Sequence, residues 1–358
     1  MNARTLSPLR GGTEGNIRSE EEHPVLTILC LLGCPGTEPE TPPEPAPDPV
    51  PLAAPKHVVL FGAVPEEAYG DPPPSRALVD LGRMLYFDAR LSGSGALSCN
   101  SCHDLARYGT TAAATSGDPG EAGTARNAPS TYNAILQFKQ YWDGRADDLE
   151  AQARSALLSP QELGMASESA VIEAIKAIEG YGPAFEAAFP DARSPITIGN
   201  IARALVAFQG GLTTPGSKLD RYLSGEGGAL SPEEIEGFDR FVSTGCVSCH
   251  SGALIGGGMF QRLGSVYPYE TEDQGRAGQS KDPVEEKIFK VPSLRNVTKT
   301  GPWLHDGSLD SLEDVVGRMA HHQLGRELTS EEITSIVLFL ETTMGYPSSD
   351  YIEPPELP

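Results

Sequence analysis

Two short segments of this 358-residue chain carry residue types that can hold a redox-active metal group. Each has two cysteines three positions apart and a histidine directly after the second: Cys99-Asn100-Ser101-Cys102-His103 and Cys246-Val247-Ser248-Cys249-His250. Two thiols at this spacing can bond to the two vinyl groups of one haem, and the adjacent histidine then lies beneath the iron. The sequence therefore predicts two covalently bound c-type haems, with His103 and His250 as proximal ligands.

Other uses of paired cysteines explain the pattern less well. A thioredoxin-like C-x-x-C needs no following histidine and is expected in a strand–helix–strand context, which is missing here. A zinc site built from both pairs uses four thiolates and leaves the two adjacent histidines unexplained. Six cysteines in 358 residues are also too sparse for a disulfide scaffold.

The positions of the histidines limit which residue could be the second axial ligand of the first predicted haem. An iron with both axial positions filled transfers electrons, whereas one with an open or releasable position does chemistry. None of the seven histidines lies between His103 and His250. The first half of the chain therefore offers no distal histidine from its own middle.

The elements that position these residues are predicted to be helices. Amphipathic helical spacing covers 78–87, 169–178, 198–209, 231–241 and 329–340, and period-2 alternation is nearly absent. A helix comes before each pentad, so the two halves look like a duplicated unit. We expect a mainly α fold, with two cytochrome c-like haem domains in tandem and few strands.

Composition divides the chain into five segments. A glycine-rich stretch at 223–229 indicates the boundary between two haem domains. The predicted divisions are a signal or lipoprotein-like segment at 1–33, a proline-rich tether at 34–56, an N-terminal domain at 57–225, a C-terminal domain at 226–345 and a tail at 346–358.

The N-terminal region is typical of an exported protein. The apolar run Val25–Gly33 has the length of a signal h-region and is followed at once by Cys34, the residue that a lipoprotein signal would lipidate. Glu20, Glu21 and Glu22 stand where a basic region is expected, so a chance apolar run stays open as the alternative. Because c-type haem is attached after export, we expect a periplasmic protein, anchored to the outer membrane at Cys34.

Charge and hydropathy exclude other classes of protein. The chain has 27 Lys and Arg against 49 Asp and Glu, a formal net charge of −22, which argues against a nucleic-acid partner. Residues 1–56 carry four basic and eight acidic side chains, so −18 remains for the rest. No apolar stretch reaches the ~20 residues of a transmembrane helix, so a membrane contact is expected only through a lipid anchor.

Several segments together resemble the bacterial di-haem cytochrome c peroxidase family, which includes the MauG-type oxidases. The similarity runs from about Leu78 to Gly345. Besides the two pentads, the matching segments are Leu81–Asp88, Arg126–Ser130, Tyr141–Ala146, Pro160–Met165, Val291–Val297, Gly301–Gly307 and Met319–Gly325.

The resemblance implies roles for the two haems. The His103 haem would be the low-potential, peroxidatic centre. The His250 haem would be the high-potential centre, with Met319 as its sixth ligand; one of the nearby residues His321 and His322 is the alternative ligand, and a core methionine the alternative role for Met319. His/Met ligation raises a reduction potential and therefore suits electron entry.

The resemblance also implies roles for residues around the haems. Trp142 would lie between the haems and couple them, although such a residue can equally be a packing residue. Glu162 would be the acid above the peroxidatic iron and Gln152 its hydrogen-bonding neighbour, with a surface glutamate as the alternative for Glu162. Cleavage of peroxide needs a group that moves a proton from one oxygen to the other, and a desolvated carboxylate can do so.

A calcium ion and a homodimer are implied as well. Asn127, Thr300 and Pro302 match positions that bind calcium between the domains, through the asparagine side chain and backbone carbonyls. Hard oxygen ligands of this kind suit calcium.

One departure from the family pattern concerns the gate of the peroxidatic haem. Many members carry a loop histidine that blocks this iron, and the corresponding stretch 115–121 has none. We therefore expect an open haem at His103. MauG-type oxidases also have an open haem, but they place a tyrosine where Met319 stands.

These features predict a peroxidase that reduces hydrogen peroxide to water with electrons from a small cytochrome c or cupredoxin. A MauG-like oxidase acting on a protein or small molecule is the first alternative. A di-haem electron carrier without catalysis is the second.

Overall fold

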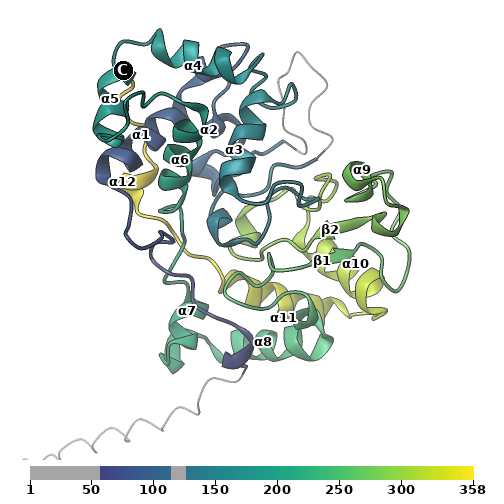
Figure 1. Cartoon of the computed structure of the whole chain (residues 1–358). Helices are drawn as coiled ribbons and strands as arrows, with labels where there is room; N and C mark the ends of the chain where they lie inside the picture. Colours follow the sequence, from purple (N-terminus) through teal and green to yellow (C-terminus); the bar gives the residue numbers. More distant parts are fainter. Residues whose placement is uncertain (1–56, 114–125) are drawn as a thin grey trace, which may run out of the picture. The chain divides into compact units, whose positions relative to one another are not determined.

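The computed structural model describes residues 57–113 and 126–358. The expected signal segment, the proline-rich tether with its anchor at Cys34, and the stretch 115–121 all lie outside the described residues, so they stay predictions. The described chain is mostly helical (Figure 1). Within it, one sheet is formed by β1 (Phe260–Arg262) and β2 (Ile288–Lys290), paired antiparallel with Gln261 opposite Phe289. The prediction of a mainly α fold with few strands is confirmed.

The helices follow one another from residue 76 to residue 352. They are α1 Arg76–Phe87, α2 Cys99–Cys102, α3 Leu149–Leu158, α4 Glu168–Lys176, α5 Tyr181–Ala188, α6 Ile198–Gln209, α7 Lys218–Leu223, α8 Pro232–Thr244, α9 Ala277–Ser280, α10 Leu312–Leu324, α11 Ser330–Glu341 and α12 Ser349–Ile352.

The five helices expected from periodicity are α1, α4, α6, α8 and α11. Their first turns are fixed by side chains that bind free backbone amides. The Ser231 hydroxyl accepts from the Glu234 amide at the start of α8, and Pro232 occupies the first turn, where its missing N–H costs nothing. Thr329 and Glu332 form the same reciprocal box at the start of α11.

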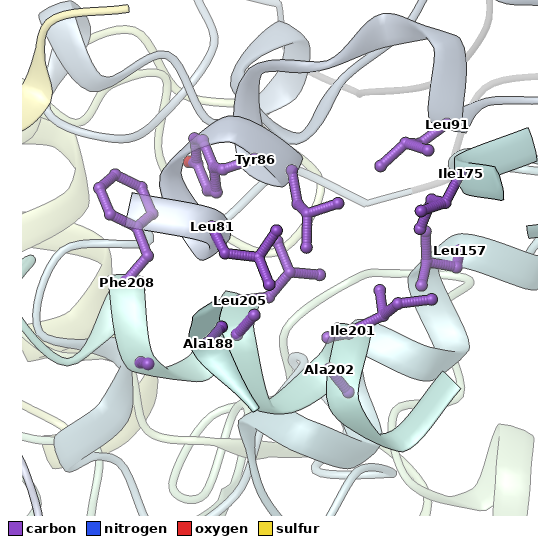
Figure 2. Packing of buried hydrophobic residues seen from close by; sticks show 14 of the residues in the cluster. Leu81, Tyr86, Leu91, Leu157, Ile175, Ala188, Ile201, Ala202, Leu205 and Phe208 are labelled. Atoms are coloured by element: carbon purple, nitrogen blue, oxygen red, sulfur yellow. The ribbon is translucent and has the colours of Figure 1, made fainter. Parts of the chain in front are cut away.

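The first apolar core lies between α1 and α6 (Figure 2). Leu81, Leu85, Leu205 and Phe208 are almost fully buried there. The two helices approach closely at Gly82, where a Cβ atom would lie 1.8 Å from the Ala204 carbonyl oxygen. A glycine at this position is therefore what permits the crossing.

The second apolar core repeats this arrangement between α8 and α11. The rings of Phe238 and Phe339 stack with their centroids 4.6 Å apart. The close approach is again at a glycine, because a Cβ atom on Gly237 would lie 2.1 Å from the Ser335 carbonyl oxygen. In both halves, the helix before the pentad crosses the last long helix of that half at a glycine.

The predicted domain limits differ from the packing at both ends of the chain (Figure 1). Phe61, expected in the N-terminal domain, packs in the second core with Phe238, and its backbone bridges to Gly252. The segment expected to be a tail contains α12, where Tyr351 stacks on Phe208 and donates its hydroxyl hydrogen to the Phe208 carbonyl over 2.6 Å. Apolar side chains at the two chain ends cover cores distant in sequence, which composition alone cannot indicate.

No helix of the described residues combines the length and the apolar character that a membrane crossing needs.

Candidate haem sites

The first pentad forms a single helical turn. Helix α2 contains Cys99 and Cys102, and the His103 amide donates to the Cys99 carbonyl over 2.9 Å. Ser98 and Ser101 form a capping box that fixes the start of this turn. Burial lowers the pKa of His103. The imidazole is therefore neutral at ordinary pH, which is the form that can bind a metal.

A cavity of about 800 Å³ opens beside this turn. Cys99, Cys102 and His103 line it together with Glu162 and Gln152, so the structure brings the predicted acid and its neighbour to the first pentad. Two thiols beside a neutral imidazole are the groups that hold c-type haem. The residues present therefore fit the predicted group.

Two residues that sequence reasoning did not single out surround the Glu162 carboxylate. Tyr141 donates its hydroxyl hydrogen to Glu162 Oε1 over 3.3 Å, and Arg145 Nη2 lies 3.8 Å from the same oxygen. The Arg145 guanidinium also stacks over the Tyr141 ring, 3.3 Å from its centroid. Both belong to Tyr141–Ala146, one of the segments that resemble the peroxidase family, and this resemblance was the sequence signal that could have identified them.

The protonation of Glu162 reflects opposing effects. Burial is the largest and raises the pKa of the carboxyl group, while Arg145 and the Tyr141 hydroxyl act to lower it. The pKa lies above its ordinary value as a result. A carboxyl group with a raised pKa is a stronger base than an ordinary carboxylate, and it can release the proton again as an acid.

The backbone that carries Arg145 is held by a network of ion pairs. Arg126 Nη1 donates to Asp143 Oδ2 over 2.7 Å, and its Nε and Nη2 atoms donate to the two oxygens of Asp273 over 2.7 and 2.8 Å. Arg145 Nη1 binds the other Asp143 oxygen over 3.2 Å. Asp143 is buried and Arg126 largely so, and Arg126 binds Asp273 in a bidentate manner, so these pairs are stronger than surface ion pairs.

The second pentad follows α8 without a gap. Gly245 ends that helix with φ of 106°, a left-handed conformation that favours glycine, and a short 3₁₀ turn Cys246–Ser248 begins at once. His250 Nδ1 donates to the Ile255 carbonyl over 3.1 Å, so its Nε2 atom keeps the lone pair that binds a metal. Burial lowers the pKa of His250 to about 4.

A second cavity, of about 230 Å³, is lined by Cys246, Cys249, His250 and Met319. Met319 reaches it from α10, a helix that the periodicity did not single out. Two thiols, a neutral imidazole and a thioether fit a c-type haem with His/Met ligation.

The alternative ligands on the same helix are engaged elsewhere. His321 binds Glu327, and the Nδ1 atom of His322 lies 3.1 Å from the Tyr267 carbonyl. Neither histidine belongs to the residues that line the second cavity.

Trp142 lines both cavities. Its indole N–H donates to the Asn127 carbonyl over 2.9 Å, and its own carbonyl accepts from the Lys290 amide over 2.7 Å. The ring lies edge-on to His305, with centroids 6.4 Å apart. The indole is therefore held at a wall that the two cavities share, and its role in coupling the haems stays a prediction.

The three predicted calcium ligands also come together. Asn127, Thr300 and Pro302 all line the second cavity. The Asn127 amide donates to the carbonyls of Pro302 and Leu304, over 2.6 and 3.3 Å. In this arrangement the amide nitrogen faces the carbonyls, so a cation would require the Asn127 side chain to turn its oxygen inward. The calcium site stays a prediction.

Comparisons with known proteins agree with this geometry. The sequence profile of the family described as "Di-haem cytochrome c peroxidase" matches residues 76–228. A cytochrome c551 peroxidase of Nitrosomonas europaea is 40% identical over 276 residues, 76% of this chain and 81% of that protein. One of Pseudomonas aeruginosa is 35% identical, over 84% and 88% of the two chains. This chain belongs to the di-haem cytochrome c peroxidase family.

Proteins that carry the name MauG, or are described as MauG-like, are also similar. The methylamine utilization protein MauG of Methylorubrum extorquens is 33% identical, over 78% of this chain and 81% of that protein. The crystal structure of a MauG-like protein associated with microbial copper homeostasis superimposes with a TM-score of 0.71 and 29% identity, covering 82% of this chain and 97% of that one.

Membership of the di-haem cytochrome c peroxidase family makes this chain a haem peroxidase with two c-type haems. The chain has two C-x-x-C-H pentads, and each described cavity is lined by the cysteines and histidine of one of them. The roles of the individual residues, including Met319 as a ligand and Glu162 as the acid, stay predictions that this geometry fits.

Proposed function

We propose that this peroxidase reduces hydrogen peroxide to two waters, consuming two protons and two electrons supplied singly by a small cytochrome c or cupredoxin. The observation that carries the proposal is the Glu162 carboxyl group, with its raised pKa, in the cavity of the first pentad. The relatives named cytochrome c551 peroxidase support the same reaction.

Haem iron bound at His103 supplies the redox chemistry of peroxide cleavage. Glu162 takes a proton from one peroxide oxygen and delivers it to the other, which leaves as water. Tyr141 and Arg145 hold the carboxylate in place and keep part of its population ionised, so that it can act as a base. Gln152, on the same cavity wall, is the second polar group that orients peroxide.

Electron entry is assigned to the His250 side of the molecule. Met319 and His250 line one cavity, and this pair of ligands suits a high-potential centre. Trp142 lines that cavity and the peroxidatic one, so its indole is placed to couple the two centres electronically.

A MauG-like oxidation of a protein or small molecule is the second candidate. It is favoured by the 33% identity to a protein of that name. The methionine at position 319 argues for the peroxidase. Steady-state assays separate the two: turnover of peroxide with a reduced cytochrome supports the peroxidase, whereas oxidation of a partner protein without cytochrome turnover supports the oxidase.

Electron paramagnetic resonance of the oxidised protein, with and without peroxide, tests the open peroxidatic site. We expect one high-spin and one low-spin signal, and loss of the high-spin signal on adding peroxide. Two low-spin signals would show that a side chain closes the first haem. Of the described histidines, His103 and His305 line this cavity, and His305 Nε2 already lies 3.1 Å from Thr271 Oγ1. A high-spin haem that reacts with peroxide removes the electron-carrier alternative.

The setting of the enzyme is inferred from the sequence. We propose export to the periplasm with a lipid anchor at Cys34, a calcium ion held by Asn127, Thr300 and Pro302, and a homodimer. The negative charge of −18 from residue 57 onward supports a basic electron donor, whose association would be steered electrostatically. An association rate that does not change with salt would contradict this donor.

A further inference from the structure

Lys290 is a buried cation at the end of β2. The residue is 5% exposed and lines the cavity of the second pentad. Its ammonium group donates to Gln137 Oε1, a neutral amide oxygen. No Asp or Glu of the described residues lines this cavity, and no described carboxylate pairs with Lys290. The ammonium is therefore buried and has no carboxylate counter-charge among the described residues that line this cavity.

The other cation of this cavity is paired. Arg295 lies in the same lining, and its Nη2 atom lies 2.9 Å from Asp220 Oδ1, while its Nη1 atom donates to the Ser217 hydroxyl over 3.0 Å. Lys290 differs because no described carboxylate offsets the cost of burying its charge, and burial lowers the pKa of its ammonium group to about 8. At neutral pH the group is still charged.

The cavity of the first pentad is arranged differently. Its arginines, Arg126 and Arg145, are both held by carboxylates that line the same cavity, Asp143, Asp273 and Glu162. The chain has 49 acidic residues, yet none of those described lies beside Lys290. An anion at Lys290 must then come with the occupant of the cavity.

We propose that Lys290 forms an ion pair with a propionate of the haem held by Cys246, Cys249 and His250. A c-type haem carries two propionate carboxylates and no other anionic substituent, so the chemistry of the missing counter-ion is defined. The positive charge of Lys290 favours the haem state that has gained an electron. It therefore raises the reduction potential of the second haem and helps to separate it from that of the first.

The backbone connects this cation to the route between the haems. The Lys290 amide donates to the Trp142 carbonyl over 2.7 Å, so the strand that carries the ammonium also holds the indole. Phe289, the preceding residue, packs on His305 with centroids 4.5 Å apart. Lys290 is thus a positioning residue for the second haem and its partner tryptophan, and it does not touch peroxide.

Spectroelectrochemical titration of the holoprotein tests the proposal. K290Q removes the charge but keeps a polar side chain, and the midpoint potential of the His250 haem should fall while that of the His103 haem changes less. K290R keeps the charge and should restore the potential of the His250 haem to near the wild-type value. The matched control is K287Q, because Lys287 precedes β2, binds the Tyr269 carbonyl over 3.2 Å and does not line the cavity.

An unchanged potential in K290Q would overturn the ion pair. If K290Q fails to retain haem, K290M removes the charge in its place. The propionate-bending band in the resonance Raman spectrum is a second measurement of the ion pair. That band should shift in K290R, where the pair persists with different geometry, and an identical band in wild type and K290R would also count against the pair. The test needs both haems but no peroxide turnover, so its failure leaves the proposed function untouched.

Discussion

The hydroxyl group of Tyr141 donates to Glu162 Oε1 over 3.3 Å, and both residues line the cavity that holds the first pentad. This hydrogen bond matters because it lowers the pKa of the Glu162 carboxyl group, whereas burial raises it. Burial favours the protonated acid, whereas the Tyr141 hydroxyl and the nearby Arg145 favour the carboxylate. A proton-transfer group needs both forms to be accessible during one turnover.

Replacing Glu162 with Gln removes the proton-accepting oxygen and leaves the size of the side chain unchanged. Peroxide turnover should fall by about 10²–10⁴-fold, the usual contribution of a positioned acid–base group. Both haems should stay attached, because Glu162 is not one of the haem-holding side chains, and absorbance spectra check this. Glu168→Gln is the matched control, since Glu168 pairs with Arg154 on the surface and should keep normal turnover. Near-normal rates in Glu162→Gln would remove the acid–base role.

The pH dependence of turnover should report the Glu162 carboxyl group. The carboxylate is the active base, so activity is lost as pH falls through its pKa, which lies above the ordinary 4.5. Arg145→Met removes a cation that lowers this pKa, so the acid limb of kcat/KM should move to higher pH.

Arg154→Met is the control for this shift, because Arg154 pairs with the exposed Glu168 and lies outside the cavity lining. Its acid limb should coincide with that of the wild type. A shift of the Arg145→Met limb to lower pH, or none at all, would contradict the assignment of this limb to Glu162.

The spacing of residues along the chain was enough to predict the two haem sites and the five amphipathic helices. The place of Glu162 and Gln152 beside the first pentad was implied by the family resemblance and not by spacing. The Tyr141–Glu162 bond was not predictable, since it joins side chains 21 positions apart, and Tyr141 has a φ of 67°, which is uncommon for a residue other than glycine. The sequence pattern contains no signal for that backbone conformation.

Contacts between segments far apart in the sequence could not be predicted either, because no sequence pattern links the residues that meet. Lys290 and Gln137 are 153 positions apart, and Tyr351 and Phe208 are 143 apart. Neither pair has a periodicity or a motif that joins it. Only the folded chain shows that the last residue of the three-residue strand β2, Lys290, lines a cavity without carboxylates among its described lining residues. The same holds for the packing of the last helix, α12, on the first core.

Replacing Met319 with Ala removes the thioether from the second cavity. The reduction potential of the His250 haem should fall, on the order of 0.1 V within the ~0.8 V range that axial ligands span. Electron entry from the donor should slow in parallel, and a redox titration with stopped-flow mixing measures both. Met344→Ala is the control, because Met344 contacts the Tyr108 and Tyr346 hydroxyls outside that cavity. An unchanged potential in Met319→Ala would discard the ligand assignment.

Replacing Gly82 with Ala tests the helix crossing that supports the first pentad. The added Cβ would lie 1.8 Å from the Ala204 carbonyl oxygen, so α1 and α6 must separate. Overpacking of this kind costs about 1–3 kcal/mol or more, and the melting temperature of the holoprotein should fall. Gly199→Ala, in the first turn of α6, has no atom within 4 Å of its new Cβ and should raise stability by about 0.4–1 kcal/mol. Equal melting temperatures for the two variants would show that the crossing tolerates a methyl group and that Gly82 is not required for it.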